Sequence, residues 1–283
     1  MSILEAIILA IVEGLTEFLP VSSTGHMIIT RDLMGMPADD AYTNAFIVII
    51  QFGAILSVVA LYWKRFFKLN HTPAPAGSTP LKAFLHKWDF YWKLLVAFVP
   101  AMVIGAAANK LIDKMLGSVM VVAIMLVVGG VFMLFCDKIF NRGSDKTKIT
   151  EKRAFSIGLF QCIAMIPGVS RSMATIVGGM AQGLSRRKAA EFSFFLAVPT
   201  MFAATCLDLL KLYMHGGLAI LSDNLMTLVV GMVVAFLVAM AAIKGFVDFL
   251  TKYGFMAFGV YRIIVGGAIL AWMLMGHELA MVD

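Results

Sequence analysis

The sequence predicts an all-α polytopic membrane protein that forms a single integral-membrane domain over residues 1–283. Of the 283 residues, 61% are hydrophobic and only 14% are charged, whereas soluble domains carry roughly a quarter charged residues. Several windows without Asp, Glu, Lys or Arg approach the roughly 20 residues that a helix needs to cross a bilayer. The sequence lacks the short alternating segments that build membrane β-barrels. The uncharged windows are 41–63, 94–109, 115–136, 192–207 and 224–243.

Internal repetition is the second observation behind this fold class. Three pairs of short matches occur in the same order along the chain, which indicates a duplication. We expect a first repeat over residues 1–137 and a second over residues 154–275. The pairs are "FLPVSST" at 18–24 with "MIPGVSRS" at 165–172, "VAFVPAM" at 96–102 with "VAFLVAM" at 234–240, and "VVGGVFML" at 127–134 with "IVGGAILA" at 264–271.

Each repeat would contain one interrupted segment and three full spans, which gives about six full transmembrane helices. Because three is odd, the second repeat starts on the opposite side of the membrane, as in inverted-topology repeats. The interrupted segments are 2–30 and 154–180, and each has a helix-breaking Pro near its middle. Non-helical backbone at membrane depth is tolerated only inside protein or beside a wet cavity. We therefore expect two re-entrant helical hairpins, with a single kinked span as the alternative for each.

Two basic loops set the expected orientation. Residues 64–93 hold six Lys or Arg, and their centre, "HTPAPAGSTP", has the composition of a flexible linker. Residues 138–153 also hold six and would connect the repeats. The positive-inside rule places both loops in the cytoplasm, so the two termini lie outside. We attribute the net charge of +6 to these loops and predict no nucleic-acid binding.

The stretch "EGLTEFLPVSSTGH", residues 13–26, places two acids within an apolar segment. Glu13 and Glu17 are four residues apart, so on a helix their side chains are neighbours. Two carboxylates in a low-dielectric site do not both ionise readily, so either one holds a proton or a cation binds with them. A helix end that reaches water is the alternative. Acids inside a membrane are costly, which favours a functional role.

The hydroxyl residues Ser22, Ser23 and Thr24 follow the break at Pro20 and would begin a new helix. They are suited to cap it, and the free N–H groups of a helix N-terminus also bind phosphate. His26 lies three residues after Ser23 on the same face, and a Ser–His pair is a minimal activated nucleophile. The alternative for His26 is a hydrogen-bonded core residue.

A second motif, "PGVSRSMAT" at 167–175, repeats the break and its hydroxyls and adds Arg171. Arginine suits planar, bidentate recognition of phosphate. Its partner would be a glutamate of the first motif or an anionic ligand, and the alternative is that it snorkels to the interface. Ser170, Ser172 and Thr175 would donate to phosphate oxygens or cap the helix. Gln51 lies mid-span and faces either the site or a neighbouring helix.

Together the two motifs closely resemble the signature motifs of the integral-membrane undecaprenyl-diphosphate phosphatases, also called bacitracin-resistance proteins. The similarity extends over the whole chain and includes "AFIVIIQFGAIL", "EFSFFLAVPTM" and "YRIIVGGA". The long "HTPAPAGSTP" linker is the one departure from the family pattern.

This resemblance implies a membrane phosphatase that hydrolyses undecaprenyl diphosphate to undecaprenyl phosphate and inorganic phosphate. The reaction recycles the lipid carrier for peptidoglycan synthesis and confers bacitracin resistance. The family is similar to inverted-repeat transporters in fold, lies in the bacterial cytoplasmic (inner) membrane, and opens its active site to the outer, periplasmic side. The implied cofactor is a divalent cation, Mg²⁺ or Ca²⁺, and the implied partners are the polyprenyl diphosphate substrate, membrane lipids and a second copy of the chain.

The resemblance also implies roles for individual residues, and the chemistry of the two motifs agrees with them. Cleavage of a phosphoanhydride needs charge neutralisation and an in-line nucleophile, either a hydroxyl activated by a base or a water. Glu13 and Glu17 would be the paired acids and metal ligands, Ser23 the nucleophile or phosphate ligand, His26 the base or alternative nucleophile, and Arg171 the phosphate clamp.

A lipid flippase or transporter is the rival hypothesis. It is favoured by the inverted repeat and the broken helices with central charges. The Ser-x-x-His pair beside two acids argues for hydrolysis, because translocation alone does not require it. Nothing specific supports a purely structural or ion-conducting role.

Overall fold

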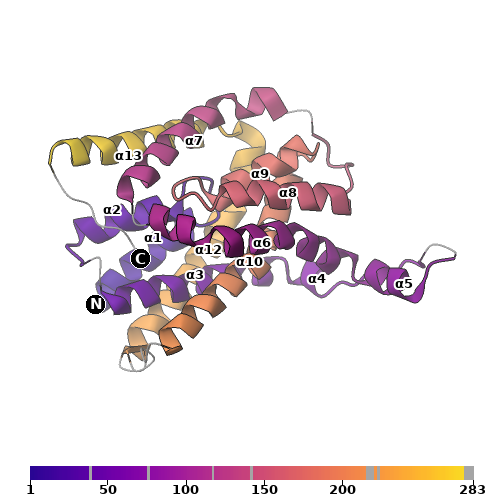
Figure 1. The fold of residues 1–283 in the computed structure, drawn as a ribbon, viewed down its shortest axis with the longest axis horizontal. Coiled ribbons are helices and arrows are strands. Elements are labelled where there is room, and N and C mark those ends of the chain that lie inside the picture. The colour runs from indigo at the N-terminus through magenta and orange to yellow at the C-terminus, as the bar shows by residue number, and fades with distance from the viewer. Residues whose placement is uncertain are drawn as a thin grey trace.

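The computed structural model describes residues 1–37, 40–74, 77–116, 118–140, 143–214, 220–221 and 224–276 (Figure 1). Within these ranges the chain is helical, with one isolated β-bridge between Ser144 and Leu184. The prediction of an all-α protein is confirmed. The first half contains α1 (Ile3–Thr16), α2 (Ser23–Leu33), α3 (Ala41–Leu61), α4 (Trp63–Phe66), α5 (Pro80–Lys87), α6 (Asp89–Leu116) and α7 (Val119–Phe140). The second half contains α8 (Glu151–Ile163), α9 (Arg171–Ala181), α10 (Arg186–Met214), α12 (Leu225–Tyr253) and α13 (Met256–Leu274).

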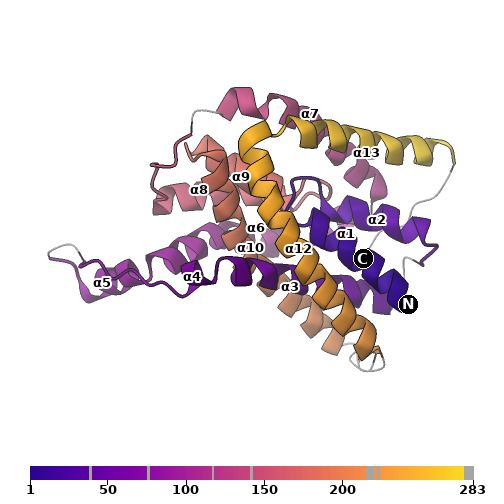
Figure 2. The ribbon, with the colours of Figure 1, turned by 180° about the vertical axis from the view of Figure 1, so that it is seen from behind.

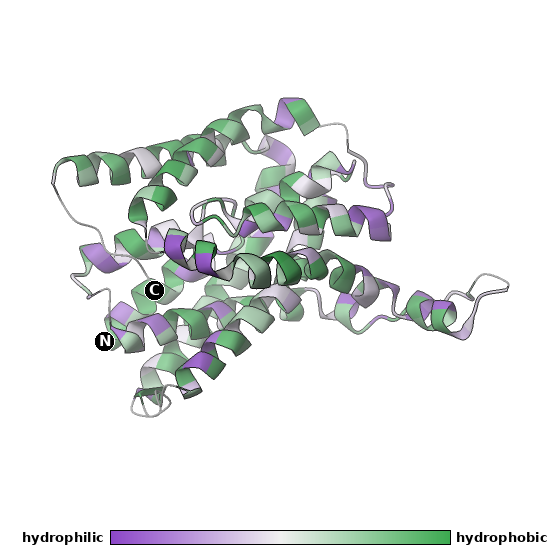
Figure 3. Ribbon diagram, in the orientation of Figure 1, coloured by the Kyte–Doolittle hydropathy of each residue, from purple (hydrophilic) through white to green (hydrophobic). Residues whose placement is uncertain are grey.

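Six helices are long and apolar enough to cross a membrane, in agreement with the predicted number of full spans. They are α3, α6 over Asp89–Ala108, α7, α10, α12 and α13. Hydrophobic residues occupy most of their length (Figure 3), and some of these residues are exposed, such as Leu95, Phe132 and Leu237. Helices that are apolar on all sides are typical of membrane spans. The chain is therefore a multi-pass membrane protein.

The basic loop 64–93 contains more helix than its composition suggested. The short helix α4 lies at its start, and α5 follows the linker. The hydroxyl of Thr79 caps α5 by accepting from the backbone N–H of Lys82, and Pro80 stands at the first helical position. Residues 75–76 of the linker and 141–142 of the connecting loop lie outside the described ranges.

Four helices are too short to cross a bilayer alone. α1 and α2 have 14 and 11 residues, and α8 and α9 have 13 and 11; at 1.5 Å per residue the longest spans about 21 Å of a roughly 30 Å core. Each pair is interrupted at the predicted place, at 17–22 around Pro20 and at 164–170 around Pro167. Both breaks end in a serine with positive φ, Ser22 at 70° and Ser170 at 77°. In the described parts of the chain no other non-glycine residue adopts this conformation. A positive φ at a non-glycine residue costs roughly 1–3 kcal/mol of conformational energy.

The two breaks meet in the middle of the molecule. α1 packs against α12, α2 and α3, while α8 packs against α6 and α9, and α9 against α10. Figure 2 shows α12 running diagonally across the molecule, with α7 and α13 together along one edge. The Ser172 hydroxyl of α9 donates to the carbonyl oxygen of Leu19 in the first break, at 2.7 Å. This arrangement brings the two sequence motifs together.

The ends of the long helices gather at two ends of the molecule. At one end, the Asp137 carboxylate of α7 accepts hydrogen bonds from Arg186 of α10 and from the backbone N–H of Phe255, just before α13. The β-bridge joins Ser144, before α8, to Leu184, after α9, at this same end. We refer to it as the basic end, because the segments 64–93 and 143–153 meet there.

The opposite end holds the beginnings of α3 and α12. The Tyr42 hydroxyl of α3 bonds to the Thr227 hydroxyl of α12. Met1, before α1, and Met34 and Met36, after α2, pack against the same hydrophobic cluster. Both flanks of the first interrupted element therefore pack against one cluster, and the β-bridge joins the two flanks of the second.

Candidate active site

Glu17 lies at the centre of the site and joins the two motifs. It follows the last residue of α1, at the start of the first break. Its Oε2 accepts a hydrogen bond from the Ser23 hydroxyl at 2.6 Å, and its Oε1 accepts one from Arg171 Nη2 at 3.1 Å. Ser23 begins α2 and Arg171 begins α9. One carboxylate thus holds a hydroxyl from its own motif and a guanidinium from the other.

Arg171 lies inside the protein rather than at its surface. Its Nη1 donates to the carbonyl oxygen of Ser193 on α10 at 3.1 Å, and its guanidinium lies 5.7 Å from the ring centroid of Phe18. The side chains of Arg171 and Glu17 are 14% and 8% exposed. The snorkelling alternative for Arg171 is therefore wrong. Its Nε is buried and has no hydrogen-bond partner among the described residues, so part of its donor capacity is unused.

Glu13 is completely buried one helical turn before Glu17. Neither carboxylate oxygen has a hydrogen-bond partner in the described parts of the protein. A buried carboxylate without donors is costly unless it binds a proton or a cation. Glu13 is thus not a helix end that reaches water, which was the alternative for this pair.

His26 is turned away from Ser23. Its Nδ1 lies 2.7 Å from the carbonyl oxygen of Ser22, so Nδ1 carries the proton and donates. Its Nε2 then accepts from the hydroxyl of Tyr261 on α13, also at 2.7 Å, and the two rings stack with an interplanar angle of 6°. Both imidazole nitrogens are therefore engaged. Ser23 is paired with Glu17 instead.

The hydroxyls of the second motif bind protein groups and fix the break. Ser172 reaches Leu19, as described above, and Ser170 Oγ lies 3.0 Å from Ser172 Oγ. The Thr175 hydroxyl donates to the carbonyl oxygen of Arg171 at 2.8 Å and lies 2.6 Å from Ser193 Oγ. Ser172 and Thr175 are fully buried. Their contacts hold the Arg171 backbone in place.

The remaining predicted residues have few polar contacts. Ser22 is buried, and its side chain does not cap α2. This leaves the first-turn N–H groups of α2 without a side-chain cap, as an anion-binding helix N-terminus requires. Thr24 and Gln51 are half-buried, and neither side chain has a hydrogen bond to the two motifs in the described residues.

Sequence reasoning missed Tyr261 and Arg262, two neighbours on α13. Arg262 is fully buried and donates to five backbone carbonyls. A charge within the apolar run "YRIIVGGA" was the available signal, because ionisable residues in a membrane span are usually functional. The five carbonyls belong to Pro20, Met125, Leu126, Gly168 and Val169, at 3.2, 2.9, 3.3, 2.7 and 2.9 Å.

Comparison with known proteins agrees with the geometry of the two motifs. The chain matches the family described as bacitracin resistance protein BacA over residues 6–268. It is 58% identical to an undecaprenyl-diphosphatase of Porphyromonas gingivalis over 281 residues, which cover 99% of this chain and 100% of the relative. Proteins of the same name from Flavobacterium psychrophilum and Bdellovibrio bacteriovorus are 52% and 50% identical, each over 100% of both chains. Because the match includes both motifs and most of α13, the chain belongs to the bacitracin resistance protein BacA family.

Proposed function

We propose that the chain hydrolyses undecaprenyl diphosphate to undecaprenyl phosphate and inorganic phosphate at the site around Glu17. The observation that carries the proposal is the double contact of Glu17. Its carboxylate binds Ser23 of its own motif and Arg171 of the second motif, 154 residues further along the chain. The relatives in the family are named undecaprenyl-diphosphatases, which supplies the substrate.

Ser23 and Glu17 carry the transfer in this proposal. Because the Ser23 hydroxyl donates to Glu17, the carboxylate is positioned to take its proton. The Ser23 oxygen attacks the terminal phosphorus, the bond to the bridging oxygen breaks, and undecaprenyl phosphate leaves. Water then cleaves the serine phosphate, and Glu17 returns its proton to the Ser23 oxygen. Glu17 thus takes the role of base that the sequence suggested for His26.

Charge neutralisation falls to Arg171 and to the start of α2. Arg171 has an unpartnered Nε, and the first turn of α2 has N–H groups without a side-chain cap. Both kinds of donor suit phosphate oxygens. His26 and Tyr261 border the same break and would position its Ser22 carbonyl rather than attack phosphorus.

The buried Glu13 fits a divalent cation, Mg²⁺ or Ca²⁺, shared with Glu17. Its two orphaned oxygens are the observation in favour. The described residues contain no group of three or more His, Cys, Asp or Glu that could hold a metal. The protein would therefore supply two carboxylates, with water and phosphate oxygens completing the shell, as is common for Mg²⁺. Such a cation would offset negative charge on the diphosphate.

The topology that we propose consists of two re-entrant hairpins, α1–α2 and α8–α9, in inverted repeats over 1–137 and 154–275. The short helices, the matching serines with positive φ, and the packing that brings the two flanks of each pair together support it. We place the basic end, with 138–153, in the cytoplasm and the site open to the periplasm of a bacterial inner membrane. A homodimer is proposed from the family resemblance alone.

The test is phosphate release from a polyprenyl diphosphate by purified variants. We expect Arg171→Ala and Glu17→Ala each to lower the rate by at least about 10²-fold. The first variant loses a charged donor to the phosphate, and the second loses the general base. Arg187→Ala is the matched control, because this exposed arginine lies near the start of α10 and pairs with Glu191 rather than with a residue of the two motifs. Full activity of either site variant would refute the assignment. Lipid flipping without phosphate release would favour the flippase instead.

A further inference from the structure

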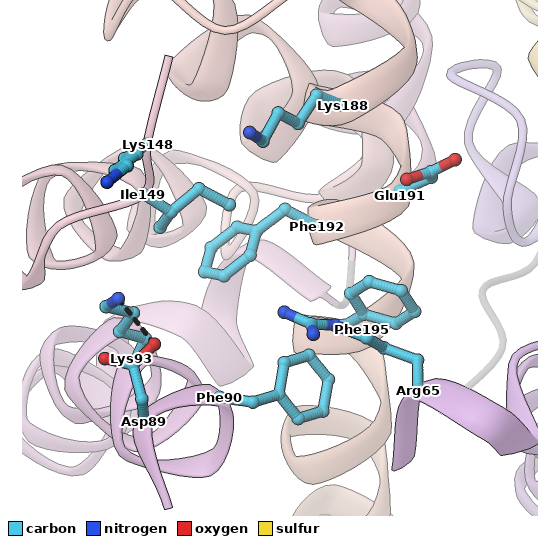
Figure 4. Close-up of a pocket in the computed structure, with 10 residues that line it drawn as sticks. All are labelled: Arg65, Asp89, Phe90, Lys93, Lys148, Ile149, Lys188, Glu191, Phe192 and Phe195. Carbon is cyan, nitrogen blue, oxygen red and sulfur yellow. Dashed lines mark hydrogen bonds and ion pairs between the residues drawn. The ribbon is translucent and has the colours of Figure 1, made fainter. Parts of the chain in front are cut away.

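A pocket lies at the basic end, where α4, α6 and α10 meet the segment before α8 (Figure 4). Its volume is about 410 Å³. Neither Glu17 nor Arg171 lines it, and neither does Ser193, which binds Arg171. The pocket is therefore separate from the proposed active site, and the phosphatase reaction does not account for it.

The pocket carries excess positive charge. Four basic residues and two acidic residues line it, and both acids already have partners. Asp89 pairs with Lys93 at 2.7 Å, and Glu191 pairs at 3.5 Å with an arginine that does not line the pocket. Arg65 and Lys148 have no acidic partner within the described residues. The four basic residues are Arg65, Lys93, Lys148 and Lys188.

One wall of the pocket is held in place by Lys188 of α10. Its Nζ donates to the carbonyl oxygens of Asp145 and Thr147, at 3.1 and 2.7 Å. These bonds fix the segment before α8 against α10. Both acceptors are neutral carbonyl oxygens, so these bonds bring no negative charge into the pocket.

The floor of the pocket is aromatic and rigid. The rings of Phe90 and Phe195 pack edge to face with centroids 5.2 Å apart, and Phe192 is buried beside them. The guanidinium of Arg65 lies 4.6 Å from the Phe90 ring centroid, which orients it over this floor (Figure 4). A bound anion would therefore meet a preformed cation above an apolar surface.

Three helices begin at this end of the molecule, namely α6, α8 and α10. Their positive dipole ends add to the charge of the side chains. Apolar side chains are exposed along this part of the chain, at Trp88 just before α6 and at Leu95 on α6. Acyl chains could follow this surface into the bilayer while a headgroup occupies the pocket. A soluble anion has no acyl chains, so it would gain no binding energy from this apolar surface.

We propose that this pocket binds the phosphate-diester headgroup of an anionic phospholipid from the adjoining leaflet. Basic pockets between transmembrane helices on the cytoplasmic side are suited to such headgroups. The aromatic floor and the exposed apolar side chains of Trp88 and Leu95 select a lipid over free phosphate. The ligand would link α4, α6 and α10 at the basic end.

Native mass spectrometry of the purified full-length protein tests this proposal. The protein is titrated with phosphatidylglycerol or with phosphatidylcholine, and the apparent Kd of the first bound lipid is measured for each. We expect phosphatidylglycerol to bind roughly fivefold more tightly or better, given the contribution of basic residues near anionic lipid. The double variant Arg65→Gln, Lys148→Gln should bring the two Kd values together.

The matched control is Lys64→Gln with Lys146→Gln, which removes the same charge from neighbouring residues that do not line the pocket. It should keep the preference for phosphatidylglycerol. An equal loss in the control would show diffuse surface attraction and overturn the proposal, as would the absence of any preference in the unmodified protein. In a separate experiment, inorganic phosphate is added to the lipid-bound protein, and chloride at equal ionic strength serves as the control anion. Displacement of the lipid by phosphate would assign the pocket to a free anion and overturn the lipid assignment.

Discussion

At the scale of single residues, Glu17 contacts two groups that the proposed reaction uses differently. Arg171 donates to one carboxylate oxygen and the Ser23 hydroxyl donates to the other, so the arginine holds the carboxylate where it would take the serine proton. The ion pair therefore prepares the base. His26 has no comparable access to Ser23, because both of its nitrogens are bonded elsewhere.

The role of Ser23 gives the first prediction. Ser23→Ala removes the attacking oxygen, so phosphate release should fall on the order of 10³-fold or more. Brief reaction of the unmodified protein followed by acid quenching and mass spectrometry should detect a phosphate ester on Ser23. Ser156→Ala, at a half-buried serine of α8, is the control and should leave the rate unchanged. Phosphate found on His26 would contradict the proposed pairing.

Glu13 gives the second prediction. Glu13→Gln preserves the shape of the side chain but removes the charge that a cation would bind. We expect the Mg²⁺ concentration for half-maximal phosphate release to rise about tenfold or more, since a carboxylate ligand is lost. In the presence of a chelator, the variant should unfold at no lower temperature than the unmodified protein, because the Glu13 carboxylate has no hydrogen-bond partner among the described residues that the substitution could remove. An unchanged Mg²⁺ requirement, with normal folding, would remove Glu13 from the cation site.

Residue spacing predicted part of this site. The spacing of Glu13 and Glu17 predicted that they occupy neighbouring positions on a helix. The sequence also predicted that a buried Arg171 would need an acidic or anionic partner, and Glu17 is that partner in the structure. Spacing also suggested a Ser23–His26 pair, which does not form. The positive φ of Ser22 and the approach of Tyr261 from α13 decide that outcome, and neither is visible in local sequence.

At the scale of elements, α13 holds the two breaks together through Arg262. Its Nη1 donates to the carbonyl oxygens of Pro20 in the first break and Val169 in the second, and its Nη2 donates to that of Gly168. Helix interruptions leave such carbonyls without intrahelical partners. Arg262 satisfies them, and it also fixes the distance between the motifs.

The third prediction concerns this contact. Arg262→Met should destabilise the protein by roughly 3 kcal/mol or more, because several buried carbonyls lose a charged donor at once. Thermal unfolding in detergent is the measurement. Tyr261→Phe is the control on the same helix, and it should leave the unfolding temperature nearly unchanged because the ring stacking on His26 remains. Equal stability of both variants would show that the breaks hold without Arg262.

The breaks themselves were predictable, whereas the element that joins them was not. Pro20 and Pro167 mark both interruptions in the sequence, because Pro removes a backbone donor. The register of α13 against the breaks depends on tertiary packing with α7, where Gly129 and Gly130 leave room for the Arg262 side chain. No local pattern encodes that register.

At the scale of the whole molecule, composition predicted the spans well because a bilayer imposes their length. The five uncharged windows lie mainly on α3, α6, α7, α10 and α12. The helix α13 has no comparable window, because Arg262 interrupts its apolar run. The helices of loop 64–93 were also missed, since their capping signals at Thr79 and Pro80 are local and the surrounding composition is that of a linker.

The last prediction separates re-entrant hairpins from kinked spans. In a protein whose Cys136, Cys162 and Cys206 are replaced by Ala, single cysteines are introduced at exposed positions that flank each interrupted element. Ser2→Cys and Leu33→Cys flank α1–α2, and Glu151→Cys and Arg187→Cys flank α8–α9. A membrane-impermeant thiol reagent is then added to intact cells.

If both elements are hairpins in the proposed orientation, the reagent labels Ser2→Cys and Leu33→Cys from outside. It labels Glu151→Cys and Arg187→Cys only after the membrane is permeabilised, because the basic end remains in the cytoplasm. A kinked span would place the members of a pair on opposite sides, so opposite labelling within a pair would refute that hairpin. The reverse pattern for both pairs would keep the hairpins and refute the orientation, which would turn the Glu17 site toward the cytoplasm.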